Sequence, residues 1–288
     1  MGLQPAFPSH DPQVFELYWS PPQVRGRAHP NLIASQRFLM NLWHSNNPET
    51  LISRSQPLAY ADRVRIRQPG DAGFALGPHI DGGSVERWEP NGYGLGGVYD
   101  KIWQGEWEEY DPWEASSRVP VVSDLYEGAG ACSMFRMFQG WLGMSNTGPN
   151  EGTLMVNPLV QLSTAYVLLR PFFEPVKQSN GLIAGEYTPD FLEAENWKLK
   201  SGEEITSDIQ GANLGHAQEL NRILHPHLDL QNTMVHIPNI NPGDYVVWHC
   251  DSKSSLTLIS TSKLSLTSGS LQQSMQWIKC IWASQTRA

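Results

Sequence analysis

The segment His79-Ile80-Asp81 constrains this chain more than any other short stretch. It follows a strand-like segment and lies inside the glycine-rich run GFALGPHIDGG. Because residues i and i+2 of a strand point to the same face, the imidazole of His79 and the carboxylate of Asp81 are expected to converge. Together they are two of the three ligands in the 2-His-1-carboxylate arrangement that holds non-haem Fe(II). The sequence therefore predicts His79 and Asp81 as metal ligands, and the third ligand must come from elsewhere in the chain.

Composition limits the classes of function. The 288 residues include 40% hydrophobic residues and 11 tryptophans, enough for a sizeable packed core. A net charge of −9 gives no counterion release on nucleic acid and no attraction to anionic membranes, so neither is an expected partner. The three cysteines, Cys132, Cys250 and Cys280, have no CxxC spacing and indicate a reducing compartment. The chain shows no basic-then-apolar leader and no apolar run of membrane-spanning length, so we expect a cytoplasmic protein.

Short strand-like segments separated by turns indicate a mainly β fold with flanking helices. Arg63–Arg67 alternates charged and apolar side chains, and Asp244–His249 is a later strand candidate. Asn31–Trp43 has helical periodicity with Asn31 as its N-cap, which predicts a helix packed on the core. Asn213–Leu224 is expected to form another helix. This order of elements favours a double-stranded β-helix, or jelly-roll, core.

The composition changes after Asp251. Residues 252–288 are dominated by Ser, Thr and Leu, and they contain no acidic residue, no proline and one glycine. The preceding chain is rich in all three, so the change marks a boundary. We therefore divide the chain into one domain at 1–251, with an N-terminal helical region, and an atypical tail at 252–288. The tail has no strand pattern that would close a barrel.

Four longer segments carry a resemblance to a known family. They are YWSPPQVRGRAHPNLIASQRFLMNLWH, YADRVRIRQPGDAGFALGPHIDGGSVERW, GACSMFRMFQGWLGMSNTGPNEGTLMVNPL and NPGDYVVWHCD, and they cover most of residues 14–251. The chain resembles the DUF1479 family of the Fe(II)/2-oxoglutarate oxygenase superfamily, which includes proteins like clavaminate synthase and phytanoyl hydroxylase. The order of motifs is similar too, with Gly152, Pro158, Gly243 and Asp244 at the positions that the wider superfamily keeps.

The resemblance implies an oxidoreductase, a dioxygenase that hydroxylates a small molecule with Fe(II) and 2-oxoglutarate as cofactors. His79, Asp81 and one later histidine would hold the iron. A cation, best an arginine, would bind the far carboxylate of 2-oxoglutarate, because a guanidinium matches a carboxylate with two hydrogen bonds.

Two departures from the family pattern concern these residues. Family members continue the HCD segment to a histidine that serves as the distal ligand, whereas this chain has DSKSS at residues 251–255 and no histidine after His249. The arginine that usually follows on the next strand has no counterpart, since Arg287 is the one arginine in the tail. We therefore expect impaired activity, and we hypothesise that the chain is a truncated or misread gene product.

Two other side chains need an interpretation. His249 lies five residues before the expected ligand position, and an odd offset on a strand points to the opposite face, so a structural role is favoured over ligation. Arg136 shares a face with Met134 and Phe138 in the apolar strand expected at Cys132–Gln139, where an arginine requires an anionic partner. That anion is either a structural carboxylate or a bound acid such as 2-oxoglutarate. His225-Pro226-His227 has ligand-like spacing but lies in a turn-like segment and is expected at the surface.

Two functions from different classes follow. The first is an oxygenase with a metal site at His79 and Asp81. The second is a catalytically silent jelly-roll relic or binding module that keeps the fold without the metal. The third ligand distinguishes them, because the facial arrangement needs three protein donors.

Overall fold

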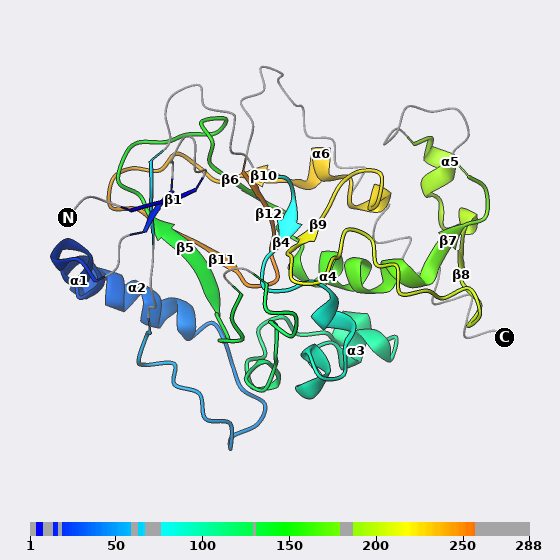
Figure 1. The fold of residues 1–288 in the computed structure, drawn as a ribbon, viewed down its shortest axis with the longest axis horizontal. Helices are drawn as coiled ribbons and strands as arrows, with labels where there is room; N and C mark the ends of the chain where they lie inside the picture. The colour runs from blue at the N-terminus through cyan, green and yellow to red at the C-terminus, as the bar shows by residue number, and fades with distance from the viewer. Residues whose placement is uncertain are drawn as a thin grey trace.

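The computed structural model describes residues 4–7, 14–16, 19–58, 63–66, 76–128, 131–178 and 187–256 (Figure 1). These residues form a mixed α/β fold with several antiparallel sheets, so the expected combination of strands and helices is confirmed at that level. None of the helices within these ranges has the length and apolar character needed to cross a membrane. The α-helices are α1 (Pro21–Arg27), α2 (Pro30–Met40), α3 (Asp100–Trp103), α4 (Val160–Leu169), α5 (Pro189–Leu192) and α6 (Leu230–Thr233). The 3-10 helices are η1 (Val85–Trp88), η2 (Tyr93–Leu95), η3 (Trp107–Glu109), η4 (Ser116–Arg118), η5 (Arg170–Phe172), η6 (Ala194–Asn196) and η7 (Pro226–Leu228).

Five short strands form the central sheet, and every neighbouring pair in it is antiparallel. Across the sheet the order is β10 (Val235–His236), β6 (Leu154–Val156), β12 (Lys253–Leu256), β4 (His79–Ile80) and β9 (Gln218–Glu219). All these neighbours are distant in sequence, so the chain crosses between layers many times before the sheet is complete. The strand β4 thereby lies between two segments that come more than a hundred residues later.

A second antiparallel sheet pairs β5 (Phe138–Leu142) with β11 (Tyr245–His249). Apolar side chains fill the space between the two sheets, including Leu154 of β6 and Val246 of β11, both buried. Ser254 of β12 pairs with both Val156 of β6 and His79 of β4, and paired residues share a face of the sheet. His79 therefore points into the layer between the sheets, as Leu154 does.

Helices cover the opposite face of the central sheet. In α4 the seven consecutive residues Ser163–Leu169 are buried, which is possible because the helix is apolar on nearly all sides. Ile80 and Met155, on the sheet face opposite to His79, pack with α4 and with the aromatic segment that contains Tyr99 and Tyr110. Figure 1 shows α3 and α4 on one side of the central sheet and β5 with β11 on the other. The site residues are thus held between two packed layers.

Two smaller sheets lie outside this arrangement. One is the three-stranded sheet of β1 (Gln4–Phe7), β2 (Val14–Glu16) and β3 (Arg63–Arg65), and the other pairs β7 (Phe173–Pro175) with β8 (Trp197–Leu199). Of the strand expected at Arg63–Arg67, residues Arg63–Arg65 form β3, and Arg67 lies outside the described residues.

The helix expected at Asn31–Trp43 forms as α2, but its details differ from the prediction. The N-cap is His29, whose Nδ1 accepts a hydrogen bond from the backbone of Asn31 at 3.3 Å, because Pro30 suits the first helical position. No side chain of α1 or α2 is buried, so the prediction that this helix packs on the core is wrong. Burial begins after the helix, at Trp43, which is 0% exposed.

Two further expectations are corrected by the sheets. The helix predicted at Asn213–Leu224 is wrong, because that segment contains turns and the edge strand β9. Regular structure also continues past the boundary set at Asp251, since β12 pairs with β6 on one side and β4 on the other. Its polar sequence hid the strand. The buried Lys253 Nζ is satisfied by hydrogen bonds to Thr164 Oγ1 at 2.6 Å and to the carbonyl of Asp251 at 3.0 Å. The rest of the tail, residues 257–288, lies outside the described residues.

A buried ion pair holds the corner between β11 and β12. Arg118 Nη2 lies 2.7 Å from Asp251 Oδ2, and both side chains are 3% exposed. Tyr99 and Tyr110 donate their hydroxyl hydrogens to the two carboxylate oxygens at 3.1 and 2.9 Å. Burial alone would raise the pKa of Asp251, but the Arg118 charge with the other nearby cations holds it well below its usual range. The carboxylate stays charged and satisfied in the core.

Removing one member of this pair should destabilise the protein strongly. Arg118→Met leaves the Asp251 carboxylate buried without its cation, which costs about 3–5 kcal/mol of unfolding free energy. The matched control is Lys198→Met, which breaks the exposed 2.9 Å pair with Glu174 and should cost less than about 1 kcal/mol. Urea unfolding followed by circular dichroism measures both. Equal losses in the two variants would contradict a structural role for the buried pair.

Candidate metal site

The structure brings the side chains of His79 and Asp81 together. The strand β4 ends at Ile80, and Asp81 follows on the face that carries His79. His79 Nε2 lies 3.3 Å from Asp81 Oδ1, and the two side chains are 15% and 27% exposed. The convergence expected from the two-residue spacing is therefore present. Their role as metal ligands stays a prediction.

A backbone carbonyl sets the orientation of the His79 ring. Its Nδ1 lies 2.7 Å from the carbonyl oxygen of Gly77, which can only accept, so Nδ1 carries the hydrogen. In the neutral ring Nε2 then presents a lone pair toward Asp81. Histidines that bind metals usually donate their other ring N–H to a carbonyl or carboxylate in this way. The ring of His79 thus has the support that a metal ligand needs.

Charge and burial act in opposite directions on this pair. Burial lowers the pKa of His79, but the hydrogen bond and charge of Asp81 outweigh it, helped by Gly77 and by the charge of Glu219, so the pKa is raised. Burial raises the pKa of Asp81, but the hydrogen bond and charge of His79 outweigh it, helped by Trp248 and by the charge of Arg136. The pKa of Asp81 is therefore lowered. In the absence of a metal, the two groups therefore favour a protonated imidazole beside a carboxylate.

The turn after Asp81 is fixed by hydrogen bonds that its backbone carbonyl groups accept. Gly82 and Gly83 have φ of +79° and +83°, and a Cβ on Gly83 would lie 2.6 Å from a backbone oxygen, so glycine is required there. Arg87, which is buried, donates to the carbonyls of Asp81 and Gly83 at 2.7 and 2.5 Å. Tyr93 donates to the carbonyl of Gly82 at 3.1 Å. Three consecutive carbonyls are thus held, which restricts where the Asp81 side chain can point.

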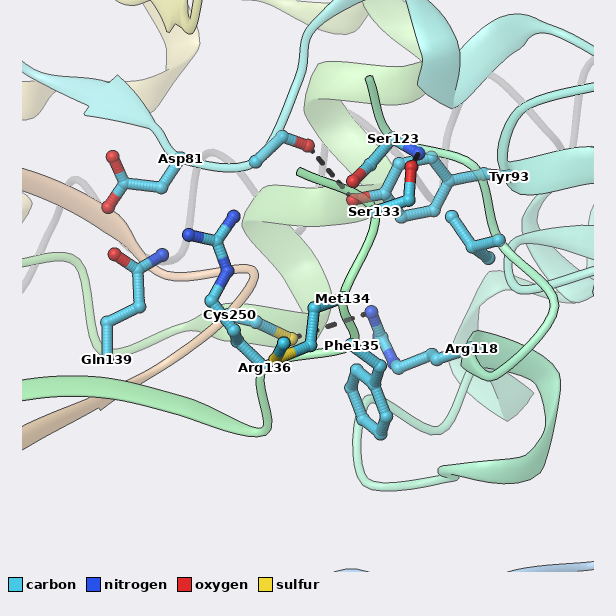
Figure 2. Close-up of a pocket in the computed structure, with 12 residues that line it drawn as sticks. Asp81, Tyr93, Arg118, Ser123, Ser133, Met134, Phe135, Arg136, Gln139 and Cys250 are labelled. Atoms are coloured by element: carbon cyan, nitrogen blue, oxygen red, sulfur yellow. Dashed lines mark hydrogen bonds between the residues drawn. The ribbon is translucent and has the colours of Figure 1, made fainter. Parts of the chain in front are cut away.

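A small pocket opens beside Asp81 and is mostly polar on this side. Figure 2 shows Arg136 and Gln139 next to Asp81, with Cys250 and Arg118 farther from Asp81 in this view. Its volume is about 40 Å³, room for an ion or a few water molecules. Arg136 lies before β5, not within a strand as the alternation predicted, because the strand begins at Phe138. Its charge nevertheless reaches Asp81, as an anion-binding residue at this place would require.

The neighbours of His79 across the sheet are Ser254 and Glu219. Ser254 of β12 pairs with it on one side and is 2% exposed. Glu219 of β9 pairs with it on the other side and is exposed. Both share the face of His79. Ser254 is also the position at which the resemblance led us to expect the distal histidine.

His249 is engaged elsewhere in the structure. Its Nε2 donates to the carbonyl of Pro112 at 2.9 Å, and its Nδ1 accepts from the backbone N–H of Asp251 at 3.0 Å. The ring stacks on Trp43 with centroids 4.8 Å apart, and burial lowers its pKa to about 4. Ligand atoms of His249, Cys250 and Asp251 lie within 4.8 Å of one another, but the histidine and the aspartate are committed to these bonds and to Arg118. His249 is a core histidine on the outer face of β11.

The pair His225 and His227 is buried rather than at the surface, so that expectation is wrong. Their Nε2 atoms bond to the carbonyls of Gln210 and Leu192, each at 3.1 Å. Burial lowers the pKa of both imidazoles to about 3. The turn-like sequence concealed this, because η7 is covered by Tyr166 and other aromatic side chains.

Comparison with known proteins identifies the family. A model of the Gig2-like family matches residues 4–265, which is most of the chain. The chain belongs to the Gig2-like family. The DUF1479 resemblance is thereby confirmed, since a solved relative, GlcNAc Inducible Gene 2 (DUF1479) from Candida albicans, is 32% identical with a TM-score of 0.73. That match covers 90% of this chain and 52% of the Candida chain.

Two bacterial relatives agree with this assignment. The Escherichia coli K12 protein YbiU is 31% identical over 243 residues, which is 83% of this chain and 49% of YbiU. A Salmonella typhimurium LT2 structure described as a "Putative Oxidoreductase" is 29% identical with a TM-score of 0.65, covering 85% of this chain and 51% of the other. The chain thus spans about half the length of these relatives.

The His79–Asp81 contact should be visible as a pH-dependent stability. Since the pKa of His79 is raised above 6.5, its contribution to the free energy of unfolding is complete below pH 6.5. That contribution is lost as the pH rises through the pKa of His79 in the folded protein. Since the pKa of Asp81 is lowered below 3.8, its contribution to the free energy of unfolding is complete above pH 3.8. That contribution is lost as the pH falls through the pKa of Asp81 in the folded protein. Asp81→Asn should therefore lose about 1–2 kcal/mol near pH 5.5 and less near pH 8.5.

The control for this measurement is a second His–Asp pair. His44 Nε2 lies 3.0 Å from Asp111 Oδ2, and both side chains are 44% exposed. Asp111→Asn should cost under about 1 kcal/mol, because exposed pairs are screened by water. Metal-free urea unfolding at the two pH values gives both numbers. A loss in Asp81→Asn that does not change with pH would contradict the ion pair.

Proposed function

We propose that this protein is an oxidoreductase of the Fe(II)/2-oxoglutarate oxygenase type, with its divalent metal held by His79 and Asp81. The observation that carries the proposal is the contact at His79, where the Gly77 carbonyl orients the ring and Nε2 lies 3.3 Å from a carboxylate oxygen of Asp81. Two neighbouring ligands of an octahedral metal with bonds near 2.1 Å lie about 3 Å apart. The separation of the two donor atoms is therefore close to what a first-row divalent ion requires.

The arrangement of sheets supports the same class. The order β10-β6-β12-β4-β9, facing β5 and β11, alternates between segments far apart in sequence. Such crossing between two facing antiparallel sheets is typical of a jelly roll. The description of the Salmonella relative as an oxidoreductase agrees with redox chemistry.

Residues in and beside the pocket have distinct roles in this proposal. His79 and Asp81 bind the metal, while Arg87 and Tyr93 hold the turn that orients Asp81. Arg136 provides the positive charge for a carboxylate of 2-oxoglutarate, which would lie beside the metal. When bound, Fe(II) and 2-oxoglutarate would supply, with O2 as the oxidant, the hydroxylation of a C–H bond in a small-molecule substrate, while 2-oxoglutarate is converted to succinate and CO2.

A second candidate, a silent relic that keeps the fold, is favoured by Ser254. A serine hydroxyl is a much weaker metal ligand than the imidazole expected at this position. With two strong protein ligands, metal affinity and hydroxylation would both be low. The two candidates differ in metal binding, so that measurement decides between them.

Metal binding should depend on His79 and Asp81. Anaerobic calorimetric titration with Mn(II) as a redox-inert probe, and then with Fe(II), should give one site per chain. His79→Ala or Asp81→Asn should weaken it at least tenfold, because each removes a donor. His44→Ala, which removes a histidine from an exposed His–Asp pair, should leave the affinity unchanged. If the unaltered protein shows no saturable metal binding, the silent relic is favoured.

Restoring an imidazole at residue 254 should strengthen the site. Ser254→His places a second ring beside His79 on the same face, so Mn(II) affinity should rise about tenfold or more. Ser254→Asn is the matched control, since it adds bulk at the same buried position with a weaker donor. Thermal unfolding checks that both variants fold. If Ser254→His folds and binds no better than Ser254→Asn, residue 254 does not face the metal.

A further inference from the structure

We infer that Gln139 binds the ligand together with Arg136, so that the far carboxylate of a dicarboxylic acid lies between a side-chain amide and a guanidinium. The inference rests on the proposed function and names a residue that selects the acid in that site. Gln139, Arg136 and Asp81 line one pocket, and Figure 2 shows the first two next to the Asp81 side chain. The two donors are therefore close enough to share a small anionic group.

The strand β5 fixes the direction of the Gln139 side chain. Gln139 is the second residue of β5 and pairs with Trp248 of β11. Residues paired across an antiparallel ladder share a face of the sheet. Trp248 packs with the cluster that contains Leu154 and Val246, in the layer between the two sheets. Gln139 therefore leaves β5 on the inner face, toward the pocket.

The other polar side chains of the pocket already have partners within the protein. Those that bond to or pair with protein groups are Asp81, Tyr93, Arg118, Ser123, Ser133 and Cys250. Gln139 makes no hydrogen bond with any residue that the structure describes, although it is half-buried. A polar group withdrawn from water without a partner is costly, so this amide is suited to a ligand atom.

Charge and volume determine which ligand group fits. Arg136 carries a permanent positive charge that reaches Asp81. A divalent metal at Asp81 would neutralise the Asp81 carboxylate, and the charge of Arg136 would then attract a second anion. A carboxylate has two oxygens, one to accept from Arg136 and one to accept from the Gln139 amide. The volume of about 40 Å³ admits one such group rather than a whole acid.

The test uses two acids that differ at one end. 2-Oxoglutarate and 2-oxopentanoate share the 2-oxo acid group, but 2-oxopentanoate has a methyl group in place of the far carboxylate. Each is titrated calorimetrically and anaerobically into the Mn(II)-loaded full chain. Gln139→Ala should bind 2-oxoglutarate about tenfold more weakly, because it lacks a hydrogen bond to a charged oxygen. The same variant should bind 2-oxopentanoate as the unaltered chain does.

Two further variants complete the comparison. Gln104→Ala is the matched control, since it removes an exposed glutamine at the end of α3, on the other side of the central sheet. It should leave both affinities unchanged. Gln139→Asn keeps the amide on a shorter side chain and should recover part of the affinity for 2-oxoglutarate. Thermal unfolding checks that each variant folds.

The outcomes separate the inference from the proposal beneath it. If Gln139→Ala weakens both acids equally, or weakens neither, Gln139 does not contact the far carboxylate and the inference is wrong, while the metal site stands. If the unaltered chain binds Mn(II) but neither acid, the proposed cosubstrate and the inference fail together. If it binds no Mn(II), the proposed function fails as a whole.

Discussion

The buried pair of Arg118 and Asp251 is the interaction on which the rest of this structure depends. It lies at the corner where the chain leaves β11 in one sheet and enters β12 in the other. Beside it, Ser252 N–H bonds to the carbonyl of His249, and Lys253 Nζ bonds to the carbonyl of Asp251. The corner is therefore held by charge, backbone and side-chain bonds together. Because β12 pairs with β4, the position of His79 depends on this corner.

The same group of charges connects the core to the site. Arg87 donates to the carbonyl of Asp81, and the charge of Asp251 is among the causes that raise the pKa of Arg87 despite its burial. Lys253, buried next to the corner, has its pKa lowered to about 7 by burial, although the charge of Asp251 opposes this. One buried carboxylate thus compensates several cations. Its loss would affect both the sheet and the turn that orients Asp81.

Local patterns in the sequence predicted part of the site. The two-residue spacing placed His79 and Asp81 on one face, because a strand alternates strictly. The odd offset does not explain the position of His249, since the corner at residues 250–252 separates it, on β11, from residue 254 on β12. The contacts between residues far apart in the chain could not be predicted from the sequence. Arg118 and Asp251 are 133 residues apart, and the strand β12 has no apolar alternation because its buried lysine is satisfied by α4. The edge strand β9 was hidden by a helix prediction, since a strand of two residues leaves no periodic signal.

Ser254, at the position where a histidine was expected, would change how a metal here holds an organic acid. With His79 and Asp81 as its two strong protein donors, the metal would be held weakly, because the facial arrangement needs three. The attraction for an organic acid would then have to come largely from the pocket wall, where Arg136 lies next to Asp81. Arg118 is already paired with Asp251 at 2.7 Å, so it is committed to the core.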